Sequence, residues 1–313
     1  MSQAPHRLAA IGECMIELSP LDGCSFAMSF AGDTLNMAIY CVRCSDPIQV
    51  TVDYITALGD DHYSAAMLQQ WQDEGVGTDL IRKIPSKLPG LYLIRNGIKG
   101  DREFCYYRSQ AAARETFAGA VGDALCEELL NFNTIYLSGI TLAILQESGR
   151  EKLITALRRA HEAGIAVCFD TNYRAQLWPN AAMAKKVIES VLECTWIALP
   201  SFEDATTLFG DKTPEHTAQR LRSIGVEEIV VKQGAAGYFL ANHDGERYVA
   251  IQAVNGVIDT TAAGDSFNGA YLAARLHGVN PVVAAQRGAA LAALVVTHKG
   301  AIVPSEAMQA CDT

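Results

Sequence analysis

An aspartate in a turn of small residues is the feature of this sequence best suited to chemistry. Residues 259–273 read DTTAAGDSFNGAYLA, and Asp265 falls in the first turn of a predicted helix. The first N–H groups of a helix lack intrahelical partners and carry partial positive charge, so the backbone of Ala262, Ala263 and Gly264 can hold an anion such as phosphate. A carboxylate would repel that anion, so its presence indicates a reaction rather than simple binding. The combination suits phosphoryl transfer, in which amides hold the moving group and a carboxylate takes a hydroxyl proton.

The whole stretch resembles the second signature of the ribokinase-like (PfkB) carbohydrate kinases. The resemblance implies that the turn binds the terminal phosphate of ATP and that Asp265 is the catalytic base. The plainer interpretation is that Asp265 only stabilises a helix start. At a helix N-terminus its pKa is expected to be low, which is no objection, because a loose transition state depends more on positioning than on basicity. Ala262 replaces a glycine that is usual in the family, a change that is harmless only if its φ is negative.

A second polar turn lies near the N-terminus. Residues 31–36 read AGDTLN and lead into a predicted helix. Gly32 allows a ligand to approach closely, while Asp33 and Asn36 offer hydrogen bonds to sugar hydroxyls; taken alone, Asp33 could equally be a helix cap. The segment resembles the first signature of the same family, which implies that Gly32, Asp33 and Asn36 bind the sugar.

Two arginines favour an acidic sugar. Arg108 ends the segment EFCYYR and Arg174 lies in DTNYRAQLW, and each has a planar fork that can grip a carboxylate. Tyr92, Tyr106 or Tyr107 could add phenolic donors. Together with LPGLY and AGDTLN, these segments are similar to those family members that phosphorylate 2-keto-3-deoxygluconate, a sugar acid. Arg108 could instead be a solvated or salt-bridged residue at a lid edge, and Arg174 could contact an ATP phosphate.

A glycine-containing turn is suited to the nucleotide. Residues 230–237 read VVKQGAAG, a predicted strand followed by a turn in which Gly234 and Gly237 let the backbone approach a ring or a phosphate. Lys232 could contact phosphate oxygens. Neither the GxxxxGK[ST] nor the GxGxxG pattern occurs, which disfavours a P-loop protein and a dehydrogenase. The resemblance implies further contacts to the nucleotide from Asn172, Ser201 and Ala289.

The resemblance also implies that Mg²⁺ accompanies ATP. This ion keeps much of its water and is held mainly by the phosphates. The family's Asn and Glu that order the ion appear here as Ser201 and Asp204, and the shorter Asp204 could still reach a metal-bound water. Asp259 and Thr261 resemble family ligands of a monovalent cation such as K⁺, although either could equally be a turn cap.

Composition limits the classes of partner. The chain has 313 residues, half of them hydrophobic, so it can bury a large core. Its net charge of -10 and pI of about 5.2 disfavour binding to nucleic acid or to an acidic membrane, because no excess of Lys and Arg can neutralise phosphates. The partners that the resemblance implies are small molecules, a sugar acid and ATP.

The N-terminus and the cysteines favour a cytoplasmic location. The start, MSQAPHRLAAIGE, has no long apolar core after a basic segment, and the longest apolar stretch, residues 288–296, is too short to cross a bilayer. The nine cysteines lack the spacing of a disulfide framework, which fits a reducing compartment. Cys41 and Cys44 form a CxxC within a predicted helix, and the lack of a second pair argues against a metal or redox site.

From residue 135 onward, short apolar runs alternate with helical patterns. The predicted strand and helix pairs are 135–138 with 148–163, 166–170 with 180–193, and 196–198 with 203–209. This βαβ rhythm predicts a doubly wound, three-layer α/β/α fold with a mostly parallel sheet and with ligands at the carboxyl ends of its strands. The segments 171–174, 200–204 and 234–237 follow such strand ends and should line one crevice.

Residues 15–30 and 91–107 break this rhythm. They read as extended pieces with turns at 21–23 and 96–101, which predicts a small separate sheet within a single ribokinase-like domain spanning residues 1–313. The resemblance implies that these strands form a lid that excludes water from the sugar. Lids of this kind often pair between subunits, which would make the protein a homo-oligomer. The plainer interpretation is a pair of surface hairpins.

The sequence therefore predicts an ATP-dependent kinase that phosphorylates the 6-hydroxyl of 2-keto-3-deoxygluconate. A sister kinase acting on fructose or ribose is the nearest alternative, and the two arginines argue against it. A non-catalytic sugar or nucleotide sensor is a further alternative. Retention of Asp265 beside the anion turn argues against a sensor, because such a protein would gain phosphate affinity by losing the acid.

Overall fold

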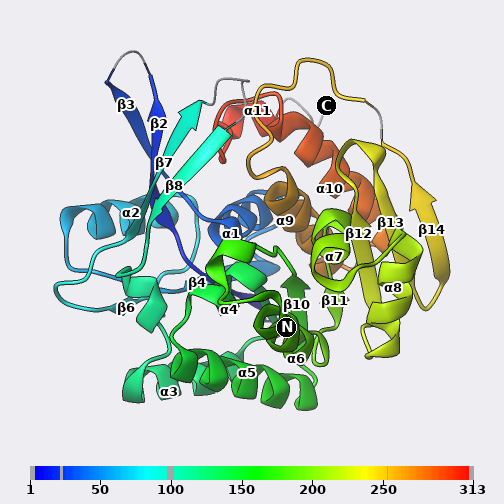
Figure 1. Ribbon diagram of the computed structural model, residues 1–313, viewed down its shortest axis with the longest axis horizontal. Coiled ribbons are helices and arrows are strands. Elements are labelled where there is room, and N and C mark those ends of the chain that lie inside the picture. The colour runs from blue at the N-terminus through cyan, green and yellow to red at the C-terminus, as the bar shows by residue number, and fades with distance from the viewer. Residues whose placement is uncertain (1–3, 22–23, 97–101, 252, 310–313) are drawn as a thin grey trace.

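A computed structural model of the protein describes residues 4–21, 24–96, 102–251 and 253–309. Its main sheet has eight strands in the order β14-β13-β12-β11-β10-β9-β1-β4 (Figure 1). The pairings from β4 to β12 are parallel, while β13 and β14 are antiparallel at one edge. The strands are β1 His6–Ile11, β4 Val50–Ile55, β9 Thr134–Ser138, β10 Ala166–Asp170, β11 Ile197–Ala198, β12 Glu228–Lys232, β13 Tyr238–Asn242 and β14 Gly245–Val249.

Helices cover both faces of this sheet (Figure 1). One face carries α3 Gly119–Glu128, α5 Glu147–Glu162, α6 Ala181–Leu192, α7 Phe202–Phe209 and α8 Pro214–Ser223. The other carries α1 Asp33–Arg43, α2 His62–Asp73, α9 Ala263–Leu276 and α10 Pro281–Val295. The shorter elements are β5 Ala57–Leu58, β6 Arg82–Lys83, α4 Gly139–Ile144 and α11 Ser305–Gln309. The predicted three-layer α/β/α class with a mostly parallel sheet is confirmed.

Strand β1 shows why the sheet is buried on both sides. Ala9 and Ile11 belong to one hydrophobic cluster, while Leu8 and Ala10 belong to the other. All four side chains are fully or almost fully buried. Since successive strand residues point to opposite faces, a run of apolar residues is what a strand between two helical layers requires.

The packing of α9 against α1 positions the future site. A Cβ on Gly269 would lie 2.7 Å from the Cβ of Tyr40 and 2.8 Å from the carbonyl oxygen of Met37. Only glycine at this position lets the two helices approach so closely. The contact brings the N-terminal turn of α9 next to the N-terminal half of α1.

A second, four-stranded sheet stands beside the main body (Figure 1). This small sheet consists of β2 Met15–Pro20, β3 Phe26–Ala31, β7 Gly90–Asn96 and β8 Arg102–Tyr107, in the order β3-β2-β7-β8. Strands β2 with β3 and β7 with β8 are antiparallel, whereas β2 and β7 join the two halves in parallel. Most of the two predicted turns, namely residues 22–23 and 97–101, lies outside the described residues.

The described part of the chain bears on three features: a membrane span, the CxxC pair and a metal cluster. None of its helices is long and apolar enough to cross a bilayer. Cys41 is buried within α1, while Cys44 caps the helix end and is exposed, so the CxxC thiols do not share one environment. Nowhere among the described residues do three or more His, Cys, Asp or Glu side chains group as a metal site.

Ala262 adopts a left-handed backbone conformation immediately before α9. Its φ is 60° and its ψ is 11°. Alanine in place of the family's glycine would be harmless only with a negative φ, and this requirement is not met. The backbone of Ala262 is therefore strained in a conformation that glycine adopts freely.

Replacing Ala262 with glycine should stabilise the protein by about 1 kcal/mol, because the left-handed conformation costs alanine more than glycine. The matched control is Ala118→Gly, at the N-cap of α3, where φ is -80°. Chemical unfolding of both variants gives the comparison, since both gain the same N-cap preference for glycine. A gain for A262G no larger than that for A118G would contradict the strain.

Candidate active site

One cleft brings the candidate residues together. It has a volume of about 1480 Å³ and lies between the carboxyl ends of β10, β11 and β12 and the small sheet. Its lining includes every residue nominated from the sequence except Tyr107: Gly32, Asp33, Asn36, Tyr92, Tyr106, Arg108, Asn172, Arg174, Ser201, Asp204, Lys232, Gly234, Gly237, Asp259, Thr261, Ala262, Ala263, Gly264, Asp265 and Ala289. Tyr107 is not part of the lining; it is 67% exposed, because neighbouring strand residues face opposite sides.

Asp265 lies in the first turn of α9 and faces α1. One of its carboxylate oxygens, Oδ2, accepts a hydrogen bond of 2.8 Å from Asn36 Nδ2. The Ala263 N–H already donates to the carbonyl oxygen of Thr260 at 3.3 Å, within the turn itself. The amides that a first helical turn leaves for a ligand are therefore chiefly those around Gly264.

The expectation of a low pKa for Asp265 is wrong. Burial raises the pKa of this carboxyl to about 7, and repulsion from Asp33 and Asp170 adds to the effect. The Asn36 hydrogen bond and the Lys232 charge act in the opposite direction but are weaker. Loss of hydration therefore outweighs any favourable effect of the helix terminus.

The N-terminal turn of α1 is tied to the loop after β10. Asp33 Oδ2 accepts a hydrogen bond of 2.8 Å from Asn172 Nδ2, and burial raises the pKa of Asp33. Asn172 has a positive φ of 28°, an unfavourable conformation for a residue with a side chain. A Cβ on Gly32 would lie 2.0 Å from the carbonyl oxygen of Glu13, so no other residue fits there. Gly32, Asp33 and Asn172 thus form one fixed unit at the cleft.

Arg108 is held in a buried ion pair. Its Nη2 donates to Glu13 Oε2, and its guanidinium carbon lies 5.7 Å from the centroid of the Tyr106 ring. Burial raises the pKa of Glu13, although Arg108 opposes the shift. The salt-bridged alternative for Arg108 is therefore the one that the geometry supports, and a ligand carboxylate here would share the guanidinium with Glu13.

Tyr92 is also engaged by an acid that sequence reasoning missed. Its hydroxyl donates to buried Glu17, which accepts further hydrogen bonds from Ser19 at 2.8 Å and Ser29 at 3.2 Å. Burial and the neighbouring carboxylate raise the pKa of Tyr92. The ring still lines the cleft, but its donor is used within the small sheet. Of the two tyrosines Tyr92 and Tyr106, it is therefore Tyr106, which is 38% exposed, whose phenol is open to a ligand.

The loop after β10 and the N-terminus of α7 meet on the opposite side. Arg174 Nη1 donates to the Tyr173 carbonyl oxygen at 2.9 Å and lies 3.8 Å from Asp204 Oδ1. Asp204 Oδ2 accepts the Tyr173 N–H at 3.1 Å, and burial raises its pKa. Ser201 caps α7 through a 3.1 Å hydrogen bond from the Asp204 N–H to its Oγ. Arg174 is about half exposed and is not locked in a buried pair.

Lys232 lies at the end of β12 beside the anion turn. Its Nζ pairs with Asp170 Oδ2 at 2.7 Å and donates to Asn268 Oδ1 at 3.0 Å. Asp170 also lines the cleft, and sequence reasoning did not nominate it or Asn268. The position of Asp170 as the last residue of a predicted strand was the signal that could have found it. For Asn268, the only signal in the sequence was its position three residues after Asp265.

The far end of the cleft is apolar. Gly234 has a φ of 54° and Gly237 a φ of 105°, so the turn after β12 depends on both glycines. A Cβ on Gly237 would lie 2.1 Å from the Val249 carbonyl oxygen. The remaining walls come from aliphatic side chains: Ile251, Val254, Ile258, Ala289, Ala292, Ala293 and Val296. Such walls suit a flat aromatic ring.

Asp259 is built into the turn that precedes α9. Its Oδ1 accepts the Thr261 N–H at 2.9 Å, and its Oδ2 accepts the Gly300 N–H at 2.9 Å. Of the two interpretations drawn from the sequence, this geometry supports the turn cap. The carboxylate joins the start of α9 to the segment after α10.

Comparison with known proteins agrees with this geometry. The sequence profile for the pfkB family carbohydrate kinases matches residues 5–308. The 2-dehydro-3-deoxygluconokinase of Escherichia coli K12 is 45% identical over 308 residues, which cover 97% of this chain and 99% of that protein. The enzyme of the same name from Dickeya dadantii is 43% identical, covering 97% of this chain and 98% of that protein.

The fold comparison gives the same result. The crystal structure of a PfkB protein from Polaromonas sp. JS666 superimposes with a TM-score of 0.81 at 26% identity, covering 98% of this chain and all of that chain. The match extends over the main sheet and the small sheet alike, since nearly the whole chain is included. Both signatures, the cleft and the near-complete match therefore lead to one conclusion: the chain belongs to the pfkB family of carbohydrate kinases.

Proposed function

We propose that this protein transfers the γ-phosphoryl group of ATP to the 6-hydroxyl of 2-keto-3-deoxygluconate. The observation that carries the proposal is the placement of Asp265, whose partly buried carboxylate lies in the first turn of α9 beside Gly264 and Lys232. Relatives that are 43–45% identical over nearly their whole length bear the corresponding name. A phosphoryl group at the turn and a hydroxyl at the carboxylate would be in the order that transfer requires.

Asp265 would take the hydroxyl proton as the bond to phosphorus forms. A pKa of about 7 makes it a better base than an ordinary aspartate. Asn36 fixes one carboxylate oxygen at 2.8 Å, which leaves the other oxygen for the substrate. The amides around Gly264 and the ammonium of Lys232 would stabilise charge on the phosphate that is transferred.

ATP fits the remaining part of the cleft. The apolar end would take the adenine ring, and the turn with Gly234 and Gly237 would let the backbone follow the nucleotide. Mg²⁺, when bound with ATP, supplies positive charge that offsets charge on the phosphates. Asp204 lies where it could hold a metal-bound water, although Tyr173 and Arg174 already contact it. K⁺ near Asp259 and Thr261 stays a prediction.

The acid end of the substrate would be read by Arg174, Arg108 and Tyr106. Arg174 has the more available guanidinium, because Arg108 is paired with Glu13. That pair is also the observation that favours a second candidate, a sister kinase acting on a neutral sugar such as fructose. A neutral substrate would leave the Glu13–Arg108 pair undisturbed.

The small sheet would act as the lid. Met15, Tyr92, Phe104 and Tyr106 line the cleft from this side and would exclude water from the transferring phosphoryl group. Its outer strand β3 exposes Phe26 and Met28, which supports pairing of two copies through the lids. A cytoplasmic location stays the expectation, because the reaction needs ATP.

An assay of ADP formation with a panel of sugar acids and neutral sugars tests the proposal. We expect 2-keto-3-deoxygluconate to give a kcat/KM at least tenfold above those for fructose and ribose. A higher value for a neutral sugar would favour the sister-kinase alternative. No ATP-dependent turnover with any sugar would leave only the sensor.

Replacing Arg174 with alanine should raise the KM for 2-keto-3-deoxygluconate about tenfold or more, because a charge-assisted bidentate contact is lost. Arg108→Ala should have a similar effect on the acid but little effect on a neutral sugar. Arg158→Ala, which removes an exposed arginine of α5 away from the cleft, is the control. Unchanged selectivity for acid over neutral sugar in both cleft variants would remove the arginines from recognition.

Replacing Asp265 with asparagine should cut kcat by about 10²- to 10⁴-fold.

The replacement of Asp265 with asparagine should also stabilise the protein at pH 8. Because the pKa of the folded state lies above the usual 3.8, the folded protein keeps a proton that the unfolded chain releases, and stability falls as the pH rises toward 7. The gain in melting temperature should therefore shrink toward pH 4.

Thermal unfolding of wild type and D265N between pH 4 and pH 8 measures this effect. Asp123→Asn is the control, since Asp123 is a surface residue of α3 and should show no comparable trend. A stability difference between D265N and wild type that does not vary with pH would contradict the raised pKa.

A further inference from the structure

Asp170 is the centre of a buried polar network between three strands and α9. Its Oδ2 accepts hydrogen bonds from Lys232 Nζ at 2.7 Å and from Asn268 Nδ2 at 2.6 Å. Its Oδ1 accepts the Asn172 N–H at 3.2 Å. Asn268 Nδ2 also lies 3.0 Å from the hydroxyl of Tyr136 on β9. Buried charges are tolerated when they are paired and hydrogen-bonded in this way.

The network places a cation at the anion turn. The Nζ of Lys232 lies 3.6 Å from the point at which a Cβ would stand on Gly264. A lysine side chain has four rotatable bonds and loses much entropy when it is fixed in one place. Asp170 and Asn268 hold it from one side, which leaves its remaining donor for a ligand at Gly264.

Asp170 also competes with the proposed base for the ammonium. Asp265 is the other acid that feels the charge of Lys232, and that charge lowers its pKa. Without Asp170, the ammonium would be drawn to Asp265. A direct ion pair between Lys232 and Asp265 would occupy the ammonium that binds the phosphate and the carboxylate that takes the proton. The groups that act on Asp265 are Asp33, Asn36, Asp170 and Lys232.

Resting on the proposed function, we infer that Asp170 is a positioning residue of the phosphoryl site. It acts through Lys232, by fixing the ammonium beside Gly264 for the terminal phosphate of the nucleotide. Asn268 completes the arrangement by joining Asp170 and Lys232 to the same helix that carries Asp265. The role differs from that of a base or a metal ligand, because Asp170 need not touch the reactants.

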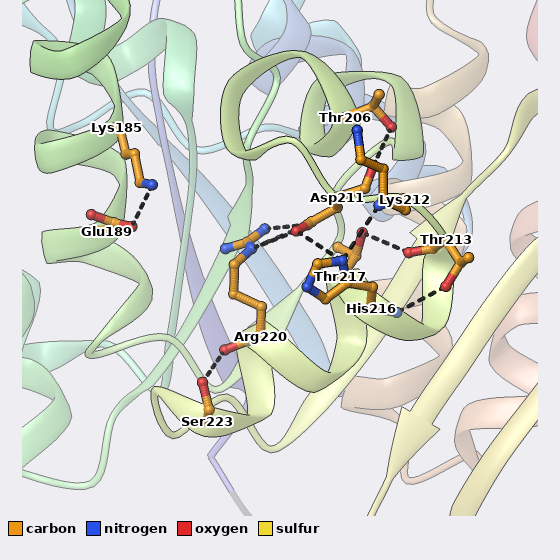
Figure 2. A network of polar contacts seen from close by, with 10 residues as sticks. All are labelled: Lys185, Glu189, Thr206, Asp211, Lys212, Thr213, His216, Thr217, Arg220 and Ser223. Atoms are coloured by element: carbon orange, nitrogen blue, oxygen red, sulfur yellow. Dashed lines mark hydrogen bonds and ion pairs between the residues drawn. The ribbon is translucent and has the colours of Figure 1, made fainter.

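The same protein contains a matched ion pair that lies outside the cleft. Asp211, buried just after α7, accepts hydrogen bonds from Arg220 Nε at 3.1 Å and Nη2 at 2.9 Å (Figure 2). Figure 2 also shows His216 beside this carboxylate, with its Nδ1 at 3.9 Å. Neither Asp211 nor Arg220 is among the residues that line the cleft. The pair fixes α7 to α8 and offers a control for the general cost of removing a buried charge.

The test compares four variants: Asp170→Asn, Lys232→Met, the double variant D170N/K232M, and Asp211→Asn. Calorimetry measures the Kd for a non-hydrolysable ATP analogue with Mg²⁺, in the absence of sugar. We expect D170N and K232M each to weaken binding tenfold or more. The double variant should bind no more weakly than K232M, because Asp170 acts through the lysine. D211N should lower the melting temperature and leave the Kd within twofold of wild type.

Wild-type affinity in D170N would overturn the inference, as would losses that multiply in the double variant. An equal loss of affinity in D211N would also overturn it, because general destabilisation would then explain the result. If D170N does not fold, the double variant, which removes the cation as well, is compared directly with K232M, and weaker binding than K232M refutes the role. The binding measurement contains no sugar, so its result does not depend on the sugar acid being the substrate. The proposed function fails separately, if the wild-type protein does not phosphorylate the sugar acid.

Discussion

The site depends on gathering three carboxylates in one cleft, where Asp170 is buried and Asp33 and Asp265 are partly buried. Asp33, Asp170 and Asp265 repel one another across the cleft, and burial adds to the cost of ionising them. Two amides and one ammonium offset this cost: Asn172 bonds Asp33, Asn36 bonds Asp265, and Lys232 pairs with Asp170. Each acid thus has its own side-chain donor, and Asn172 links two of them, because its backbone N–H also donates to Asp170.

This electrostatic arrangement depends on how two helices pack. Asn36 reaches Asp265 because α1 and α9 lie close together, and they do so only because residue 269 has no side chain. The two halves of the site are separated by 229 positions in the chain, the spacing between Asn36 and Asp265. Helix packing therefore sets the distance between the sugar side and the phosphate side. A glycine with no chemistry of its own is as necessary to this geometry as the acid.

Much of this organisation could be predicted from the sequence. Alternating apolar and helical segments specified the parallel sheet, and turns after strand ends specified where the cleft lies, because both follow from local patterns. The family of the chain was identifiable from two turns, one around Gly32 and one around Asp265. The small sheet was also anticipated, although its parallel junction between β2 and β7 was not, since nothing local sets how two hairpins meet.

The expectations that the structure changes concern burial, distant contacts and backbone conformation, which local sequence patterns do not show. The pKa of Asp265 was expected to be low, because the helix terminus is visible in sequence whereas burial and the neighbouring acids are not. Arg108 lines the cleft as expected, but its pairing with Glu13 could not be read from the sequence, because the contact spans 95 positions. Ala262 was acceptable only with a negative φ, and the turn imposes a positive one.

The sharing of strands between two hydrophobic clusters has a consequence for how the molecule comes apart. Ala9 and Ile11 serve one cluster while Leu8 and Ala10 serve the other, so neither half can open without exposing the apolar surface of its counterpart. Unfolding is therefore expected to be cooperative across the main body. The residues that line the cleft come from both ends of the chain. A partly synthesised or truncated polypeptide would therefore lack a complete binding site.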